Sequence, residues 1–176
     1  MITKQIGKQL NGISELTALE ESVGLLYAAY AEFFPDYQQF WSDLAVEEGN
    51  HAEWLRKLND YVTQNPGTFT KNRFNTVNIE AFNDYVNDEY GKLMDHKRFL
   101  INAFSITVYI QESLIERGYF EVFSDDCPEF KQTLQDLFTA HQNQLTQVRE
   151  VFDVYKRAIL QEREEIALLY DIAETI

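Results

Sequence analysis

The stretch that decides the fold runs from Phe40 to Leu58 and reads Phe-Trp-Ser-Asp-Leu-Ala-Val-Glu-Glu-Gly-Asn-His-Ala-Glu-Trp-Leu-Arg-Lys-Leu. Its apolar residues recur at alternating steps of three and four, which is the spacing of one buried face of an α-helix. Glu48 and His51 occupy two positions on that same face. A buried carboxylate or imidazole needs a hydrogen-bond network, an opposite charge or a metal ion as partner. The stretch therefore predicts a buried helix that carries two polar groups with partners elsewhere in the chain.

An ionisable residue also interrupts three further apolar stripes. Glu20 interrupts the stripe of residues 16–34, Glu112 the stripe of residues 101–122 and His141 the stripe of residues 134–159. Only three Pro and seven Gly occur in 176 residues, which favours long helices over many short strands. The sequence therefore predicts an all-α fold, with residues 1–176 in a single domain.

Cap residues and breakers predict the helix bounds. Ser14 and Asp36 have the character of N-caps, and Pro35 and Pro128 end or begin a helix. The predicted helices are 15–34, 37–62, 79–90, 93–123 and 128–158, with an extension over residues 159–176. This extension either turns back as a separate helix or projects to meet a second subunit. The alternative we favour is contact with a partner chain through helical faces, as in a homodimer.

This order of helices predicts a four-helix bundle of two antiparallel hairpins joined by a long crossover. At 1.5 Å per residue, Glu20 lies about 22 Å before the first turn, and Glu48 and His51 lie roughly 18–22 Å after it. Glu112 and His141 flank the second turn at similar distances. All five side chains are therefore expected to converge. Carboxylates and imidazoles at one level form an oxygen and nitrogen site suited to iron, manganese or zinc.

These residues resemble a known family. The matching positions are Glu20, the Glu48-x-x-His51 motif, Glu112 and His141, which resemble the ferritin-like superfamily and its rubrerythrin-related branch. The similarity covers about residues 15–155, and residues 41–55 are the most similar part. It implies a ferritin-like bundle that binds two iron or manganese ions for peroxide or oxygen chemistry or iron oxidation. In such bundles two helices supply one Glu each, and the other two supply a Glu-x-x-His each.

The chain departs from this pattern three residues before His141, where Phe138 stands in place of the second motif's Glu. A phenylalanine cannot bind a metal ion. Glu116, one turn beyond Glu112, or a water molecule are the alternatives for the missing ligand. Cys127 is the single cysteine, so the paired CxxC motifs of a rubredoxin-type iron site are absent and no such site is expected.

Charge and hydropathy exclude several classes of function. The 29 acidic residues outnumber the 15 basic ones and give a formal net charge of −14, which repels phosphate backbones and anionic membranes. We therefore expect no nucleic-acid or membrane partner. No apolar run is long enough for a transmembrane helix, and the N-terminus lacks the apolar region of a signal peptide. A cytoplasmic location is the expectation.

Two hypotheses for function follow. The first is a metal-binding, rubrerythrin-like protein with one or two iron or manganese ions, acting as an oxidoreductase on peroxide or oxygen. The second is a metal-free bundle that keeps a degenerate site and acts as a structural or protein-interaction module. The retained Glu20, Glu48 and His51 favour the first hypothesis, and Phe138 favours the second.

Overall fold

The computed structural model describes residues 2–65, 74–95, 99–121 and 127–173, and these residues form helices joined by turns. The elements in chain order are α1 (Ile2–Phe33), the short 3₁₀ turn η1 (Pro35–Tyr37), α2 (Gln38–Gln64), α3 (Thr76–Asp95), α4 (Leu100–Glu116) and α5 (Pro128–Ala173). The described residues contain no β-strand. The predicted all-α class is therefore confirmed.

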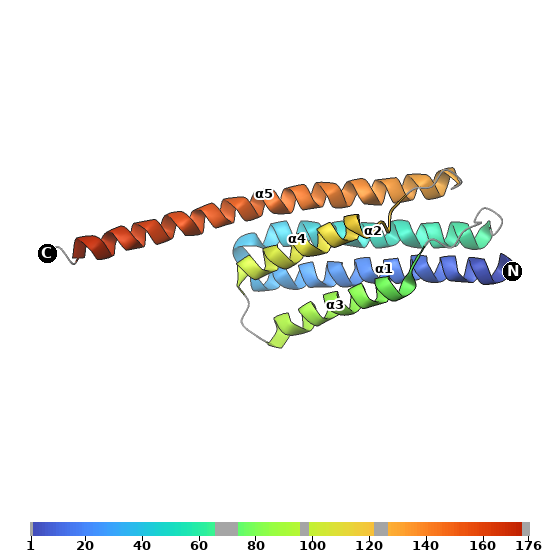
Figure 1. The fold of residues 1–176 in the computed structure, drawn as a ribbon, viewed down its shortest axis with the longest axis horizontal. Helices are drawn as coiled ribbons and strands as arrows, with labels where there is room; N and C mark the ends of the chain where they lie inside the picture. The colour runs from blue at the N-terminus through green and yellow to red at the C-terminus, as the bar shows by residue number, and fades with distance from the viewer. Residues whose placement is uncertain (1, 66–73, 96–98, 122–126, 174–176) are drawn as a thin grey trace.

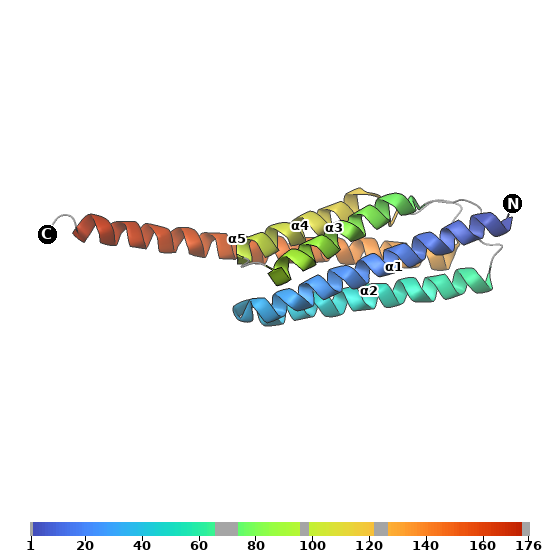
Figure 2. The same ribbon diagram turned by 90° about the horizontal axis from the view of Figure 1, so that it is seen from below.

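The helices alternate in direction along the bundle (Figures 1 and 2). α1 and α2 form an antiparallel hairpin closed by η1, and α4 and α5 form a second antiparallel pair. α3 packs against α1 and runs parallel to it. α1, α3 and α5 therefore point in one direction, and α2 and α4 point in the opposite direction. The long crossover between the two hairpins is thus itself a helix of 20 residues.

The first helix begins earlier than predicted, at Ile2 rather than near residue 15. Ser14 is not an N-cap but lies inside α1, where its hydroxyl accepts a hydrogen bond from the Asn59 side chain of α2 at 3.1 Å. Gly12 is fully enclosed against Phe74, and a Cβ there would collide with the Phe74 ring. Tertiary packing of this kind outweighs the low helix propensity of glycine.

The third and fourth helices also differ from their predicted bounds. α3 continues through Gly91 to Asp95, and α4 covers only Leu100–Glu116 instead of residues 93–123. Residues 96–98 and 122–126 lie outside the described residues. Gly118 follows α4 with φ +68°, a left-handed conformation that glycine adopts without strain and that commonly ends a helix. The apolar stripe therefore continued past the helix that bears it.

α5 is one continuous helix of 46 residues, about 69 Å long at 1.5 Å per residue. Its second half projects beyond the other helices (Figure 1). The alternative in which residues 159–176 turn back as a separate helix is wrong for the described residues, which run straight to Ala173. Leu160 and Ile166 are 58% and 46% exposed, so this projection leaves apolar side chains in solvent.

Aromatic side chains fill the bundle beside the polar residues. The Trp41 ring centroid lies 5.0 Å from those of Tyr30 and Phe104 and 6.0 Å from that of Tyr27. All four side chains are buried. Such packing excludes water and lowers the local dielectric constant, which strengthens any charge interaction next to it.

Candidate metal centre

Four ionisable side chains meet inside the bundle: Glu20 of α1, Glu48 and His51 of α2, and His141 of α5. We call them the Glu/His cluster. Each is buried, with an exposed fraction of 2% or less. One ligand atom from each residue lies within 4.8 Å of the other three. The predicted convergence of these four residues is therefore confirmed.

Glu112, the fifth predicted site residue, does not join them. Its side chain is 36% exposed and forms an ion pair with Arg149. The preceding residue, Gln111, is fully buried and takes the inward position. The predicted stripe was one residue out of phase, since Ile101, with which it began, is 41% exposed. The prediction that Glu112 faces the cluster is wrong.

The true buried face of α4 includes Phe104, Thr107, Gln111 and Leu114, a pattern of steps of three and four. Two of these four residues are polar. A pattern based on apolar residues alone therefore placed Glu112 on the buried face instead of Gln111. The spacing from Phe104 through Thr107 to Leu114 does predict that Gln111 is buried. This prediction requires that polar residues be accepted as part of the core.

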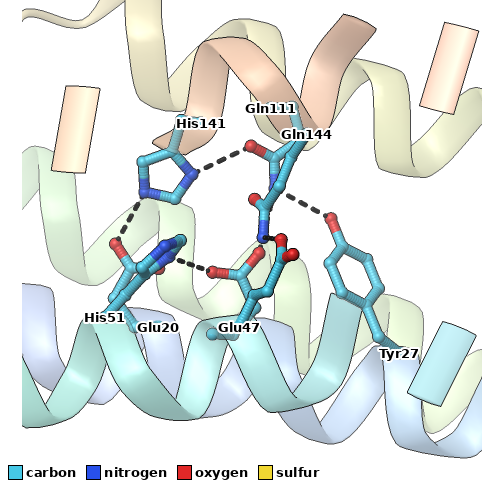
Figure 3. Close-up of polar contacts among 8 residues, drawn as sticks. Glu20, Tyr27, Glu47, His51, Gln111, His141 and Gln144 are labelled. Atoms are coloured by element: carbon cyan, nitrogen blue, oxygen red, sulfur yellow. Dashed lines mark hydrogen bonds and ion pairs between the residues drawn. The ribbon is translucent and has the colours of Figure 1, made fainter. Parts of the chain in front are cut away.

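Gln111 connects the cluster to the aromatic core (Figure 3). Its amide nitrogen donates to Glu48 Oε1 at 3.0 Å and to the Tyr27 hydroxyl at 3.2 Å. Its amide oxygen accepts a hydrogen bond from His141 Nδ1 at 2.9 Å. Because an ionised carboxylate only accepts hydrogen bonds, the amide NH₂ group must face Glu48, and the amide oxygen must face His141. Gln111 thereby places a proton on His141 Nδ1.

The other nitrogen of His141 faces a carboxylate. Nε2 lies 3.2 Å from Glu20 Oε1, and in the neutral tautomer set by Gln111 it carries a lone pair rather than a proton. A lone pair opposite a carboxylate oxygen repels it unless a cation lies between them. Either a second proton or a metal ion satisfies this contact.

His51 repeats the arrangement from α2. Its Nδ1 lies 2.8 Å from Glu48 Oε2 and 3.8 Å from Glu20 Oε2. Glu48 and His51 are three residues apart and share one helix face, as their spacing predicts. The two imidazole rings contact each other edge to face, with centroids 4.8 Å apart. Both histidines thus present a nitrogen to Glu20, and His51 also contacts Glu48.

Burial and these contacts perturb the ionisation of the cluster. Burial favours the neutral acid of Glu20, but His141 and His51 outweigh this effect and hold its pKa well below the usual range. Burial also opposes charge on His51, yet its contacts with the Glu20 and Glu48 carboxylates raise its pKa to about 10. Burial raises the pKa of Glu48, and the hydrogen bond to His51 opposes this rise. Without a metal ion, His51 therefore retains its extra proton at neutral pH.

Two buried acceptor atoms in and beside the cluster have no hydrogen-bond donor. They are Glu20 Oε2 and Gln144 Oε1. Gln144 lies one turn beyond His141, is 1% exposed, and donates its amide hydrogen to Glu47 Oε2 at 2.9 Å. Leaving a buried acceptor unsatisfied costs about 1–3 kcal/mol, and more for a charged group. Glu20 Oε2 thus accepts no hydrogen bond, although it lies 3.8 Å from His51 Nδ1.

Two other residues weighed from the sequence lie outside the cluster. Phe138 is half-buried and packs against the hydrophobic core. Glu116 is exposed, so it does not supply the replacement carboxylate that the sequence offered as an alternative. Among the residues that the structure describes, no further ionisable side chain joins the cluster in place of the Glu that the resemblance implies before His141.

The comparisons with known proteins identify no family. Neither the protein-family models, the curated proteins nor the solved structures include a match to this chain. Within the described part of the chain, every helix is too short or too polar to span a membrane. The resemblance to ferritin-like proteins accordingly remains a prediction from a few residues.

Proposed function

We propose that the Glu/His cluster binds one divalent metal ion, iron or manganese, in a ferritin-like bundle related to the rubrerythrins. The observation that carries the proposal is the contact between His141 Nε2 and Glu20, next to the unpartnered Glu20 Oε2. Two bonds of about 2.1 Å that meet at about 90–110° hold their donor atoms about 3.0–3.4 Å apart. The His141–Glu20 distance of 3.2 Å lies within that range.

Charge supports the same ion. Glu20 and Glu48 supply two negative charges, and a divalent cation with two neutral imidazoles gives a neutral buried site. Two imidazoles and two carboxylates are also a donor set that iron and manganese accept, as does zinc. The choice of iron or manganese rests on the family resemblance. Such an ion would supply one-electron chemistry towards peroxide or oxygen.

The residues around the cluster suit that role. Gln111 fixes His141 in the tautomer with Nε2 available, which is the task that a hydrogen-bonding partner of a metal-bound histidine performs. Phe120 stacks on the His141 ring with centroids 4.9 Å apart, and Trp54 lies 5.4 Å from the His51 ring. These contacts hold both imidazoles in place and exclude water.

One observation favours the metal-free alternative, in which the bundle is a structural or interaction module. Gln111 donates a hydrogen bond to Glu48 Oε1, and this contact uses one oxygen of a proposed ligand. Two extra protons, one on each imidazole, would neutralise the cluster as fully as one divalent ion does. Metal content therefore decides between the two functions.

The test is elemental analysis of untagged protein after anaerobic loading with iron or manganese and desalting. The parent should hold about one ion per chain, and the double variant Glu48→Gln/His51→Gln less than about a tenth of an ion, because it loses two of four ligands. Glu112→Gln is the matched control, since it removes a carboxylate outside the cluster. A parent without metal, or a double variant that binds as much as the parent, would contradict the proposal.

A further inference from the structure

A cavity of about 630 Å³ adjoins the cluster on the side of α5. It lies between the end of α4, the turn at Gly118 and the α5 residue Phe138. Phe120, Ile115 and Phe138 contribute its apolar lining, and Glu116 contributes a carboxylate. Its size is that of an ordinary small-ligand site, and its far wall is the ring that covers His141.

Phe120 separates the cavity from the cluster. Its side chain lines the cavity, yet only 2% of its surface is exposed, because its ring stacks on the His141 imidazole. The two rings are nearly parallel, with an interplanar angle of 13° and a centroid distance of 4.9 Å. Phe120 therefore lines the cavity and also contacts the buried His141.

We propose that this cavity is the entrance through which divalent cations reach the Glu/His cluster, and that rotation of the Phe120 ring away from His141 opens it. The proposal rests on the proposed function, because it names the route to that same site. Cations suit the route since the chain carries a formal net charge of −14 and Glu116 lines the cavity, which raises the local concentration of positive ions.

The neighbouring backbone allows such a rotation. Gly118, two residues before Phe120, has φ +68°, and Phe120 belongs to the turn that follows α4 rather than to a helix. Side chains held by a turn open locally at a smaller free-energy cost than those inside packed helices. On the other side of the cluster, Trp54 covers His51 from within α2, so its movement would have to occur inside a helix.

The test compares Phe120→Ala with Phe130→Ala in the full chain. Phe130 is as buried as Phe120 and lies in α5 about 16 Å before His141 along the helix axis. The metal-free proteins are treated with diethyl pyrocarbonate, which transfers an ethoxycarbonyl group to an unprotonated imidazole nitrogen. Mass spectrometry then gives the modification rate of His141. We expect Phe120→Ala to raise that rate about tenfold over the parent, because local opening controls access, and Phe130→Ala to leave it unchanged.

A second arm measures the rate of manganese uptake by stopped flow with a competing chelator. Phe120→Ala should bind manganese faster than the parent with the same final stoichiometry, and Phe130→Ala should match the parent. If Phe120→Ala is not helical by circular dichroism, Phe120→Leu replaces it in both arms, with a smaller increase expected. Trp54→Ala tests the opposite side of the cluster.

The two proposals fail in different ways. A parent that binds neither iron nor manganese refutes the proposed function, and the His141 modification rates still decide the route. Equal modification rates in Phe120→Ala and Phe130→Ala would overturn the entrance. An increase in Trp54→Ala instead of Phe120→Ala would also overturn it, because the path would then lie beside His51. Unchanged manganese uptake by Phe120→Ala, in a parent that does bind, has the same consequence.

Discussion

The stability of the metal-free protein should fall as the pH rises from 6 to 8, and His51 should be the main cause. Contacts with Glu20 and Glu48 raise its pKa from 6.5 to about 10 in the folded state. A raised folded-state pKa means that the folded protein binds the proton more tightly than the unfolded chain does. The stabilisation is therefore fully present below pH 6.5 and is lost progressively as the pH rises towards 10.

The size of the effect follows from the two pKa values. Each pH unit between them removes about 1.4 kcal/mol, and the first half unit above pH 6 contributes little, so the loss from pH 6 to 8 is about 2 kcal/mol. The Glu48 pKa is raised as well, so that residue changes stability in the same direction. The Glu20 pKa is lowered, and its contribution is constant in this window. For a chain of this size, the melting temperature should fall by about 4–8 °C.

The measurement is urea and thermal unfolding followed by circular dichroism at pH 6, 7 and 8, with EDTA present. His51→Gln is the control variant, because it keeps a polar side chain but cannot take up a proton. Its stability should change with pH by less than half as much as that of the parent. The comparison of slopes matters here, since other groups that both proteins share also titrate in the unfolded chain.

Saturating manganese should reverse the slope. A metal ion binds neutral imidazoles, so protons compete with it, and its affinity rises with pH. Ligand binding to the folded state alone then stabilises the protein more at pH 8 than at pH 6. Equal slopes in the parent and His51→Gln without metal would refute the assignment of the stability change to this histidine. A parent with a flat profile would do the same.

Three other outcomes follow from the placement of residues. Gln111→Glu combined with Phe138→Glu should raise the metal content from about one ion per chain towards two, as measured by elemental analysis, because it restores two carboxylates; no increase would mean that the two positions do not face a common site. Glu112→Gln should lower the unfolding free energy by less than about 1 kcal/mol in urea titrations, since its ion pair with Arg149 is partly exposed. A larger loss would indicate that the Glu112 side chain is buried in the core. Deletion of residues 159–176 should lower the melting temperature by less than about 3 °C, and a large, concentration-dependent loss would instead support the homodimer contact expected from the sequence.

Much of the fold followed from residue spacing. The buried face of α2 was predicted residue by residue, because its apolar positions are continuous and only Glu48 and His51 interrupt them. The levels of Glu20 and His141 followed from helix rise alone. The order of antiparallel hairpins with a long crossover was also predictable, since Pro35 and Pro128 mark two of the turns.

The failures have physical causes in the same chain. The start of α1 was missed because glycines and polar residues weaken the pattern before Ser14, while packing of Gly12 against Phe74 decides the outcome. The bounds of α3 and α4 were wrong because Gly91 does not end α3, and because the apolar stripe of residues 101–122 continues past the end of α4 at Glu116. Gln111 was missed because a polar amide is not expected on a buried helix face. Its hydrogen-bond partners, Glu48 and His141, are evident only in the structure.

Two residues differ from the ligand set that the ferritin-like resemblance implies: Gln111 takes the inward position expected of Glu112, and Phe138 stands in place of the second Glu. A site with a carboxylate in place of Gln111 and another in place of Phe138 would carry four negative charges with Glu20 and Glu48, which two divalent ions neutralise. This chain has an amide and a phenyl ring at those places, so the buried charge is two negative units and a single divalent ion balances it. Changing only one of the two residues would leave an unbalanced buried charge. The amide also does what a carboxylate there could not do, since its NH₂ group donates to Glu48 while its oxygen accepts from His141. We therefore propose that the cluster suits one divalent ion rather than two.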